Sequence, residues 1–316
     1  MEVRLLGKSS LLVAPLAFGG NVFGWTVDEK NAFQLLDAFI AAGFNLIDTA
    51  DSYSRWATGN KGGESETVIG NWIRGHHNRD KVIIATKVGS DMGLGKRDIS
   101  KKYIFRAAED SLRRLQTDHI DLYQTHWDVE TVPVEETLEA YAQLVKEGKV
   151  RWIGASNISP ERLKKSLEAS DKNGYPRYQT LQPEYNLYDR EKFEKQYEQI
   201  CLKENLGALS YYSLASGFLT GKYRSEVDLK KSVRGNGIRK YLNERGFRIL
   251  DALDKVAEEY HTTQASIAIA WLQSRPAIAA PIASATSVHQ LESLMLASEI
   301  KLNGEAISAL NEASKW

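Results

Sequence analysis

Short apolar runs of strand type alternate with amphipathic helical patterns along the chain, and this alternation constrains the fold more than any other feature of the sequence. Eight such repeats within 316 residues predict a closed α/β barrel, with parallel strands inside and helices outside. The expected strands span residues 14–18, 45–49, 82–87, 120–126, 150–156, 180–184, 208–212 and 277–282. The expected helices begin near residue 28 and then span 64–74, 100–115, 134–147, 159–171, 189–204, 245–260, 263–273 and 287–298.

A doubly wound open sheet is the alternative fold for the same alternation. Such a sheet normally carries a glycine-rich turn with G-x-G-x-x-G spacing after its first strand, and residues 19–24 lack that spacing. Ahead of the first barrel strand, residues 2–13 carry apolar positions on both sides of a Gly-Lys-Ser-Ser turn and predict a small β-hairpin. Because the sequence contains no linker and no low-complexity tract, we expect a single domain over residues 1–316.

Composition argues against several classes of function. Lys plus Arg and Asp plus Glu both number 41, which gives no sign of a nucleic-acid surface or a polybasic membrane patch. The single cysteine, Cys201, excludes an intramolecular disulfide and fits a reducing compartment. The first residues lack a signal-peptide pattern, and no apolar run is long enough to span a bilayer. We therefore expect a cytoplasmic protein, a monomer or small homo-oligomer, with neither nucleic acid nor membrane as a partner.

Three consecutive expected strands end in ionisable side chains. These are Asp48, Lys87 and His126, and Tyr53 follows Asp48 by five residues. Because barrel strands point their C-terminal ends at one mouth, we expect these four side chains to meet there. Taken singly, each has a structural explanation, such as a helix N-cap, a strand-end lysine that reaches solvent or a core histidine. Their joint occurrence favours an active site.

The chemistry of these four side chains points to proton transfer. Asp48 would pair with Lys87, and the ammonium would lower the pKa of Tyr53 from its ordinary value of about 10. Tyr53 would then act as a general acid, while His126 holds a substrate oxygen. This set can protonate a carbonyl oxygen but holds no hydride donor, so a cofactor is implied. No spacing of ligand residues predicts a metal site.

Five segments of the sequence resemble the aldo-keto reductase family, in the family's order and over nearly the whole chain. They are Gly43–Tyr53, Ala85–Val88, Leu122–His126, Gly148–Asn157 and Gln182–Asn186. The resemblance implies a (β/α)8 TIM barrel with an N-terminal hairpin and NAD(P)H-dependent reduction of aldehydes or ketones. It also implies that Asp48, Tyr53, Lys87 and His126 form the catalytic tetrad.

The resemblance further implies three groups of cofactor contacts. Residues matching the positions around the nicotinamide and its ribose are Ser156, Asn157, Gln182, Tyr211, Gly20, Asn21 and Asp48. Residues matching a pyrophosphate-covering loop are Ser213, Leu214, Ser216, Gly217, Leu219, Gly221 and Lys222, with Arg234 as a second basic residue. Residues matching the adenosine-binding turn are Ser284, Ala285, Thr286 and Gln290.

Several alternatives remain open from the sequence. The turn after residue 284 lacks the family's basic residue for the 2′-phosphate, so we expect NADPH but NADH is possible. The long connections 50–63 and 213–244 are candidate lids, and Trp25, Trp56 and Trp127 either shape the pocket or pack. The long-loop branch of the family includes potassium-channel beta subunits, so a weakly active, cofactor-holding sensor is the alternative to an enzyme acting on a small carbonyl substrate. A barrel that uses Lys87 as a Schiff base would need a neutral lysine, which Asp48 disfavours.

Overall fold

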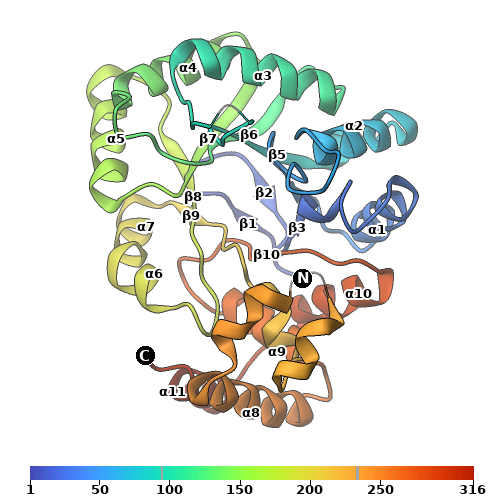
Figure 1. Cartoon of the computed structure of the whole chain (residues 1–316). Helices are drawn as coiled ribbons and strands as arrows, with labels where there is room; N and C mark the ends of the chain where they lie inside the picture. The colour runs from blue at the N-terminus through green and yellow to red at the C-terminus, as the bar shows by residue number, and fades with distance from the viewer. Residues whose placement is uncertain (94, 233–234) are drawn as a thin grey trace.

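A ring of parallel strands forms the centre of the fold in the computed structural model, which describes residues 1–93, 95–232 and 235–316 (Figure 1). The sheet order is β10-β3-β4-β5-β6-β7-β8-β9, so neighbours in sequence are neighbours in space. The strands are β3 (Ala17–Gly19), β4 (Leu46–Asp48), β5 (Ile83–Val88), β6 (Ile120–Thr125), β7 (Val150–Ser156), β8 (Tyr178–Gln182), β9 (Gly207–Ala208) and β10 (Ile282–Ala283).

The two ends of this sheet are joined to each other. Ala208 N donates to Ala277 O at 2.9 Å, and Ala279 N donates to Ala208 O at the same distance. Further along, Ile282 N donates to Ser210 O at 2.8 Å. These bonds close the ring between the last expected strand and β9, so the (β/α)8 barrel is confirmed and the open doubly wound sheet is excluded.

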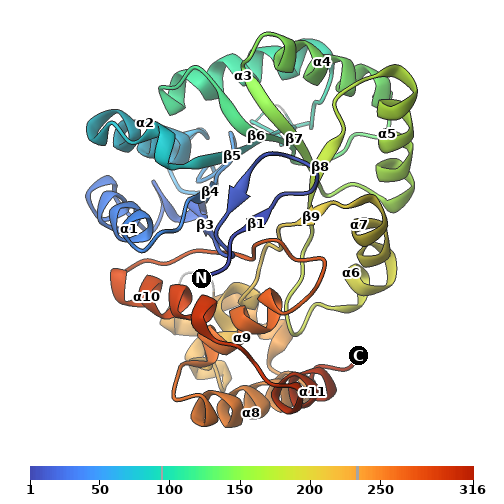
Figure 2. The same ribbon diagram turned by 180° about the vertical axis from the view of Figure 1, so that it is seen from behind.

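The expected N-terminal hairpin is confirmed and covers one end of the barrel. Strands β1 (Arg4–Leu5) and β2 (Leu12–Val13) pair antiparallel and cross in front of the ring in Figure 2. Leu6 and Leu11, from the turn between them, belong to the same buried cluster as interior residues of the barrel strands. Gly7 has a φ of +61°, and a Cβ there would lie 2.3 Å from the carbonyl oxygen of Gln179. Only glycine lets the hairpin approach the barrel this closely.

Helices surround the ring as expected. They are α1 (Glu29–Ala41), α2 (Glu64–His76), α3 (Lys101–Leu115), α4 (Val134–Lys146), α5 (Pro160–Asn173), α6 (Glu191–Gln196), α7 (Glu198–Glu204), α9 (Gln264–Gln273) and α10 (Val288–Leu296). Two further helices, α8 (Glu244–Glu259) and α11 (Gly304–Ala313), pack against each other outside this layer (Figure 1). Asp28 caps α1 as its sequence position suggested, because its side chain accepts from Asn31 N at 2.8 Å.

Two helical features differ from the sequence-based expectation. The helix expected over 189–204 is interrupted at Tyr197, whose hydroxyl donates to Ile158 O at 2.9 Å and so holds the break against the neighbouring βα loop. Helix α11 was not expected, because only Ala306 and Leu310 along it are buried. Its start is marked by Asn303, an N-cap that periodicity alone does not reveal.

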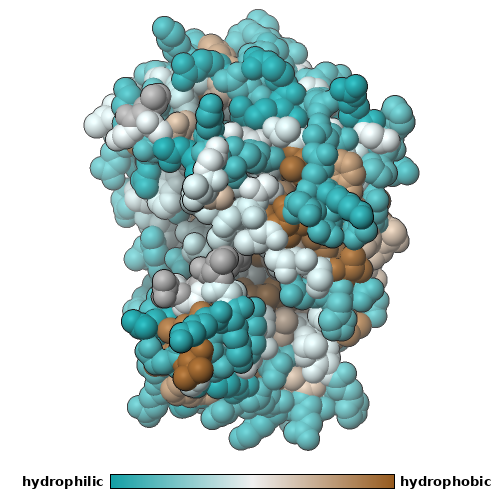
Figure 3. Space-filling view, turned by 45° about the vertical axis from the view of Figure 1, so that its right-hand side comes forward, coloured by the Kyte–Doolittle hydropathy of each residue, from teal (hydrophilic) through white to brown (hydrophobic). Residues whose placement is uncertain are grey.

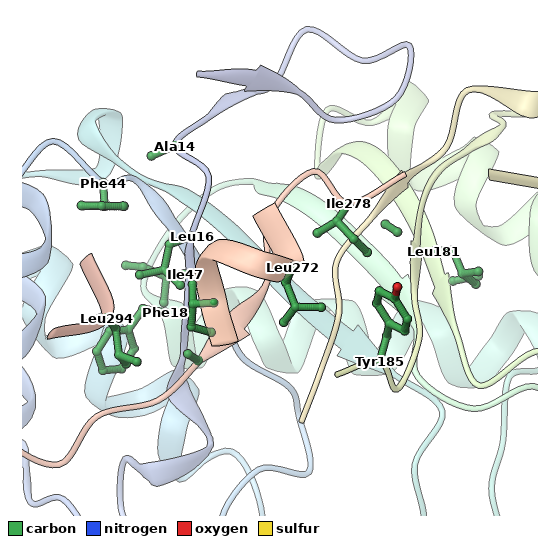
Figure 4. Close-up of a cluster of buried hydrophobic side chains, with 14 of the residues drawn as sticks. Ala14, Leu16, Phe18, Phe44, Ile47, Leu181, Tyr185, Leu272, Ile278 and Leu294 are labelled. Atoms are coloured by element: carbon green, nitrogen blue, oxygen red, sulfur yellow. The ribbon is translucent and has the colours of Figure 1, made fainter. Parts of the chain in front are cut away.

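The space between the strands and the helices is filled by one large apolar cluster. Figure 4 shows part of it, in which Phe18, Ile47 and Leu272 come from β3, β4 and α9. The Phe18 ring also packs against Phe23 and Phe39 at centroid distances of 5.2 and 5.7 Å. Burial of each such side chain stabilises the fold by about 1.5–3 kcal/mol, so the scaffold behind the strand ends is rigid.

The long connections lie at the C-terminal ends of the strands, opposite the hairpin. The segment 213–244 contains three short 3-10 helices, η3 (Ala215–Thr220), η4 (Glu226–Lys231) and η5 (Gly235–Tyr241). The face drawn in Figure 3 is mostly hydrophilic, with a few groups of apolar residues. Within the residues that the structure describes, every helix is too short or too polar to cross a bilayer.

Candidate active site

Lys87 brings together three of the four predicted catalytic residues. Its ammonium donates to Asp48 Oδ2, to Tyr53 Oη and to the carbonyl oxygen of Thr49, each at 2.7 Å. Tyr53 Oη in turn donates to Asp48 Oδ2 at 3.1 Å. The Lys87 side chain is fully buried, and an ammonium has three protons to donate, so these three acceptors satisfy it. The arrangement is therefore a closed set of charge-assisted hydrogen bonds.

The alternation of side chains along the strands places these groups. Leu46, Ala85 and Leu122 lie in the interior cluster of the barrel, on the neighbouring strands β4, β5 and β6. Side chains two residues apart along a strand share a face, so the next interior position on each strand lies nearer the mouth. Those next positions are polar on all three strands: Asp48, Lys87 and Gln124.

His126 lies beside this set without bonding to it directly. Its ring packs edge-on to the Tyr53 ring at 5.9 Å, and its Nδ1 lies 2.9 Å from Ser90 Oγ. Burial, together with the positive charges of Lys87 and Arg97, lowers the pKa of His126 well below its ordinary value. The imidazole is therefore neutral at pH 7. When the Ser90 hydroxyl donates to Nδ1, Nε2 carries the proton and is available as a donor.

The direction of the Tyr53 pKa shift contradicts the sequence-based prediction. Burial, followed by the charge and hydrogen bond of Asp48, raises the pKa of Tyr53 well above its ordinary value. The expected lowering by Lys87 is therefore wrong for this arrangement. Burial also lowers the pKa of Lys87, and it does so more strongly than Asp48 raises it. The consequence is that Tyr53 keeps its proton at neutral pH, as a proton donor must.

Of the residues expected around the nicotinamide, Gln182 and Asn157 are hydrogen-bonded to the tetrad, and Ser156 and Tyr211 are hydrogen-bonded to these two. Gln182 Nε2 donates to Asp48 Oδ1 at 2.8 Å, and Ser156 Oγ donates to Gln182 O at 2.8 Å. Asn157 Nδ2 donates to the backbone oxygen of His126 at 2.9 Å, and Tyr211 Oη donates to Asn157 Oδ1 at 3.1 Å. Asn157 holds a left-handed backbone with a φ of +44°. The ends of β7, β8 and β9 are thus tied to the ends of β4 and β6.

The residues expected near the ribose and one adenosine residue meet where β3 and β10 end. Ser284 Oγ donates to Gly19 O at 2.7 Å and lies 2.6 Å from Asn21 Oδ1. Ser65 Oγ donates to Gly20 O at 2.8 Å. Gly20 is buried, and a Cβ there would lie 2.9 Å from Ser65 Oγ. This junction joins residues from opposite ends of the sequence.

The predicted pyrophosphate loop has an unusual backbone. Ser216 and Gly217 both have positive φ values, 58° and 99°, in the middle of η3. Ser213 Oγ is anchored to Ser210 O at 3.0 Å, while Lys222 is exposed with its ammonium 5.1 Å from the Tyr223 ring centroid. The other loop residues comprise buried Leu219, partly buried Leu214 and Gly221 at a φ of +78°. Arg234 lies outside the described residues.

The predicted adenosine turn forms the N-terminal end of α10. The backbone N and Oγ1 of Thr286 both donate to Gln290 Oε1 at 3.0 Å. Ser287 caps the helix by accepting from Gln290 N, and Ala285 is buried beneath the turn. A helix N-terminus with hydroxyl side chains favours an anionic group.

Sequence reasoning missed four groups that contact or support the site. Gln124 could have been found from its spacing to Leu122, whereas Ser90 and the Thr49 carbonyl gave no signal. Asp51 is only 2% exposed, and within the described part of the chain neither of its carboxylate oxygens accepts a hydrogen bond of ordinary geometry. Burial, reinforced by the charge of Glu66, raises the pKa of Asp51 to about 8.

Two cavities bear on where a ligand could bind. A small one of about 50 Å³ is lined by Asn157, Gln182 and Tyr211, which adjoin the tetrad. A larger one of about 360 Å³ lies at the hairpin end, and Asp121 there already pairs with Arg79 and Arg151 at 2.6 and 2.9 Å. The convergent polar groups at the mouth, and not cavity size, identify the candidate site.

Comparison with known proteins identifies a family and several relatives of the chain. The sequence model of the Aldo/keto reductase family matches residues 15–315. The chain is 34% identical to "Uncharacterized oxidoreductase YrpG" of Bacillus subtilis, over 99% of this chain and 95% of that protein. It is also 34% identical to "Aldo-keto reductase YhdN" of Bacillus subtilis, over 93% and 86% of the two chains. It is 30% identical to "Probable voltage-gated potassium channel subunit beta" of Arabidopsis thaliana, over 95% and 92%.

Proposed function

Because the chain belongs to the aldo/keto reductase family, we propose that it uses NADPH to reduce aldehydes or ketones to alcohols. The observation that carries the proposal is the buried contact between Lys87 and Tyr53, in which an ammonium donates to a phenol oxygen at 2.7 Å. Burying a lysine costs desolvation free energy unless the ammonium is paired. A protein that keeps such a pair next to a tyrosine hydroxyl is therefore a candidate for proton-transfer chemistry at that site.

Tyr53 is the proposed general acid. When bound, a nicotinamide would supply a hydride to the carbonyl carbon. Tyr53 would give its proton to the carbonyl oxygen as the C=O π bond breaks. The resulting phenolate is stabilised by Lys87 Nζ, which already donates to that oxygen. An alkoxide is a stronger base than a phenolate, so the transfer is favourable even though burial raises the pKa of Tyr53.

Asp48 and His126 support this transfer in different ways. Asp48 holds the ammonium in place and is itself held by Gln182. Neutral His126 can donate from Nε2 to the substrate oxygen, which would place that oxygen near the Tyr53 hydroxyl. Each group therefore orients the proton donor or its acceptor.

The neighbouring residues have the chemistry that a nicotinamide dinucleotide requires. Side-chain amides of Asn157 and Gln182 complement a carboxamide, and the Tyr211 ring offers a stacking face. Lys222 and the N-terminal end of α10 suit phosphate groups. The hydroxyl of Thr286 at that helix end could receive a 2′-phosphate, which is why we propose NADPH ahead of NADH.

The substitution Tyr53→Phe tests the proposal. Phenylalanine keeps the ring contacts with Trp56 and His126 but has no proton to donate. We expect reduction of 4-nitrobenzaldehyde by NADPH to fall at least about 100-fold, with NADPH affinity within about twofold of the wild type. Steady-state kinetics and fluorescence titration measure the two quantities. Wild-type turnover by the variant would show that another group is the acid.

A cofactor-holding sensor is the second candidate, and the 30% identity to the Arabidopsis channel subunit favours it. Such a protein would bind NADPH but turn over slowly with every carbonyl compound. Turnover far below about one per second across a panel of aldehydes would support the sensor, whereas ordinary enzyme rates with any of them would support the reductase.

A further inference from the structure

Arg97 carries a positive charge near the mouth of the site, and among the described residues no carboxylate forms an ion pair with it. Its guanidinium carbon lies 3.9 Å from the centroid of the Trp127 ring. Within the described residues, Arg97 forms no ion pair and is exposed to solvent. A guanidinium that lies over an aromatic face still has N–H groups that can bind a carboxylate.

The aromatic side chains connect this charge to the reacting groups. The Trp127 ring stacks on the His126 ring at 6.3 Å with an interplanar angle of 27°, and His126 in turn packs against Tyr53. Arg97 is close enough to help lower the pKa of His126. The guanidinium therefore lies one ring layer beyond the histidine, at a distance that the remote end of a substrate could span.

The facing loop contributes a second guanidinium. A Cβ built on Gly93 would lie 2.8 Å from Nη2 of Arg55, so that side chain reaches from the 50–63 connection to the loop after β5. Arg55 also forms no ion pair among the described residues. Both aspartates of this loop accept hydrogen bonds from backbone N–H groups. Asp91 accepts from Gly93 N at 2.8 Å, and Asp98 accepts from Ser100 N at 2.9 Å.

These charges lie on the side of the mouth away from the expected cofactor residues. Arg97 follows β5 and Trp127 follows β6, whereas the residues assigned to the cofactor, apart from Asp48 on β4, come from the ends of β3, β7, β8, β9 and β10. The position of Arg97 therefore suits an anionic group on the substrate better than the phosphates of the cofactor.

We propose that Arg97, assisted by Arg55, binds a carboxylate on the carbonyl substrate, so that the preferred substrates are aldehydes or ketones carrying a carboxylate remote from the carbonyl. This substrate class rests on the reductase activity proposed above. The Trp127 ring holds the guanidinium in position. Because His126 is neutral, the positive charge that would attract the substrate carboxylate is that of Arg97.

The test compares two substrates of the same shape. In 4-carboxybenzaldehyde the carboxylate is charged, whereas the nitro group of 4-nitrobenzaldehyde has a similar outline and no net charge. With Arg97→Met we expect kcat/KM for the carboxylate substrate to fall roughly fivefold or more, through KM, with the nitro substrate changed less than about twofold. Arg97→Lys should restore part of the loss, because it keeps the charge without the planar fork.

Arg106→Met is the matched control, because Arg106 also lies over an aromatic ring, that of Tyr103, but on helix α3. It should leave both substrates unchanged. If Arg97→Met changes both substrates equally, or neither, the carboxylate assignment is wrong although the reductase proposal stands.

Calorimetric titration with benzoate separates failure of this inference from failure of the proposed reaction. If the wild type reduces neither aldehyde, the reductase proposal fails, and weaker benzoate binding by Arg97→Met than by Arg106→Met still supports the anion site. Equal benzoate binding by the wild type and both variants overturns it.

Discussion

Among single residues, Asp51 is the one whose charge the fold suppresses most clearly. It lies just after β4, between Asp48 and Tyr53 of the proposed tetrad, and its backbone N donates to Lys87 O. Glu66 nearby is already bonded to Thr86 Oγ1 at 2.6 Å and to Arg114 at 2.7 Å. With its neighbours engaged elsewhere, the Asp51 carboxyl remains buried and holds its proton until about pH 8.

The pH dependence of stability follows from this shift. An unfolded aspartate ionises near pH 4, so between about pH 4 and pH 8 the unfolded state releases a proton that the folded state retains. Wild-type stability should therefore fall as pH rises through that window, relative to Asp51→Asn, which cannot ionise. We expect the stability of Asp51→Asn relative to the wild type to increase by roughly 2–4 kcal/mol between pH 5 and pH 8. Urea unfolding at both pH values measures this difference, and a difference that does not grow with pH would contradict it.

At the scale of elements, the approach of α2 to α3 depends on one glycine. A Cβ on Gly70 would lie 2.1 Å from the carbonyl oxygen of Arg114 and 2.9 Å from Leu115 Cα. Both atoms belong to the backbone of α3, so neither can move without displacing the helix. The close contact holds α2 in place. Helix α2 begins where the 50–63 connection ends, and that connection carries Tyr53.

Two glycine substitutions in α2 should therefore have opposite effects. Gly70→Ala forces the helices apart and should destabilise the protein by about 2–4 kcal/mol. Gly75→Ala meets nothing within 4 Å, and alanine's higher helix propensity should stabilise the protein by up to about 1 kcal/mol. Denaturant unfolding of both variants gives the comparison. A Gly70→Ala variant as stable as the wild type would mean that the helices separate at little cost.

At the scale of the whole molecule, the expected cofactor residues run from Gly20 to Gln290 and are joined through the closed ring. Hydrogen bonds between Ser284 and Asn21 and between Gln182 and Asp48 link segments far apart in sequence. A ligand that binds all of these residues together binds only the folded state. Its binding energy therefore adds directly to the stability of the barrel.

Thermal unfolding can test the cofactor preference without any substrate. NADPH at 100 times its Kd should stabilise the protein by about 2.7 kcal/mol and raise Tm. We expect a larger shift with NADPH than with NADH at equal concentration, because the hydroxyls at the start of α10 can receive a 2′-phosphate. The reverse order would indicate NADH, and no shift with either would count against the cofactor site.

The order of strands and helices was determined by local pattern alone. Alternation and apolar runs identify β7 at residues 150–156, as the structure has it. The caps and periodicity place the start of α1 and both ends of α2 to α5 within two residues of the observed positions. The positions of Asp48, Lys87 and His126 at strand ends also follow from the sequence, because barrel topology maps strand ends to one mouth.

Tertiary structure alone decided the protonation and the supporting contacts. The raised pKa of Tyr53, the raised pKa of the buried Asp51 carboxyl and the bond between Ser90 and His126 depend on which distant groups and how much water surround each side chain. The stacking of Arg97 on Trp127 likewise joins two loops that the sequence keeps apart. Sequence pattern reports the local periodicity that makes strands and helices, whereas desolvation and long-range contacts exist only after the segments have packed together.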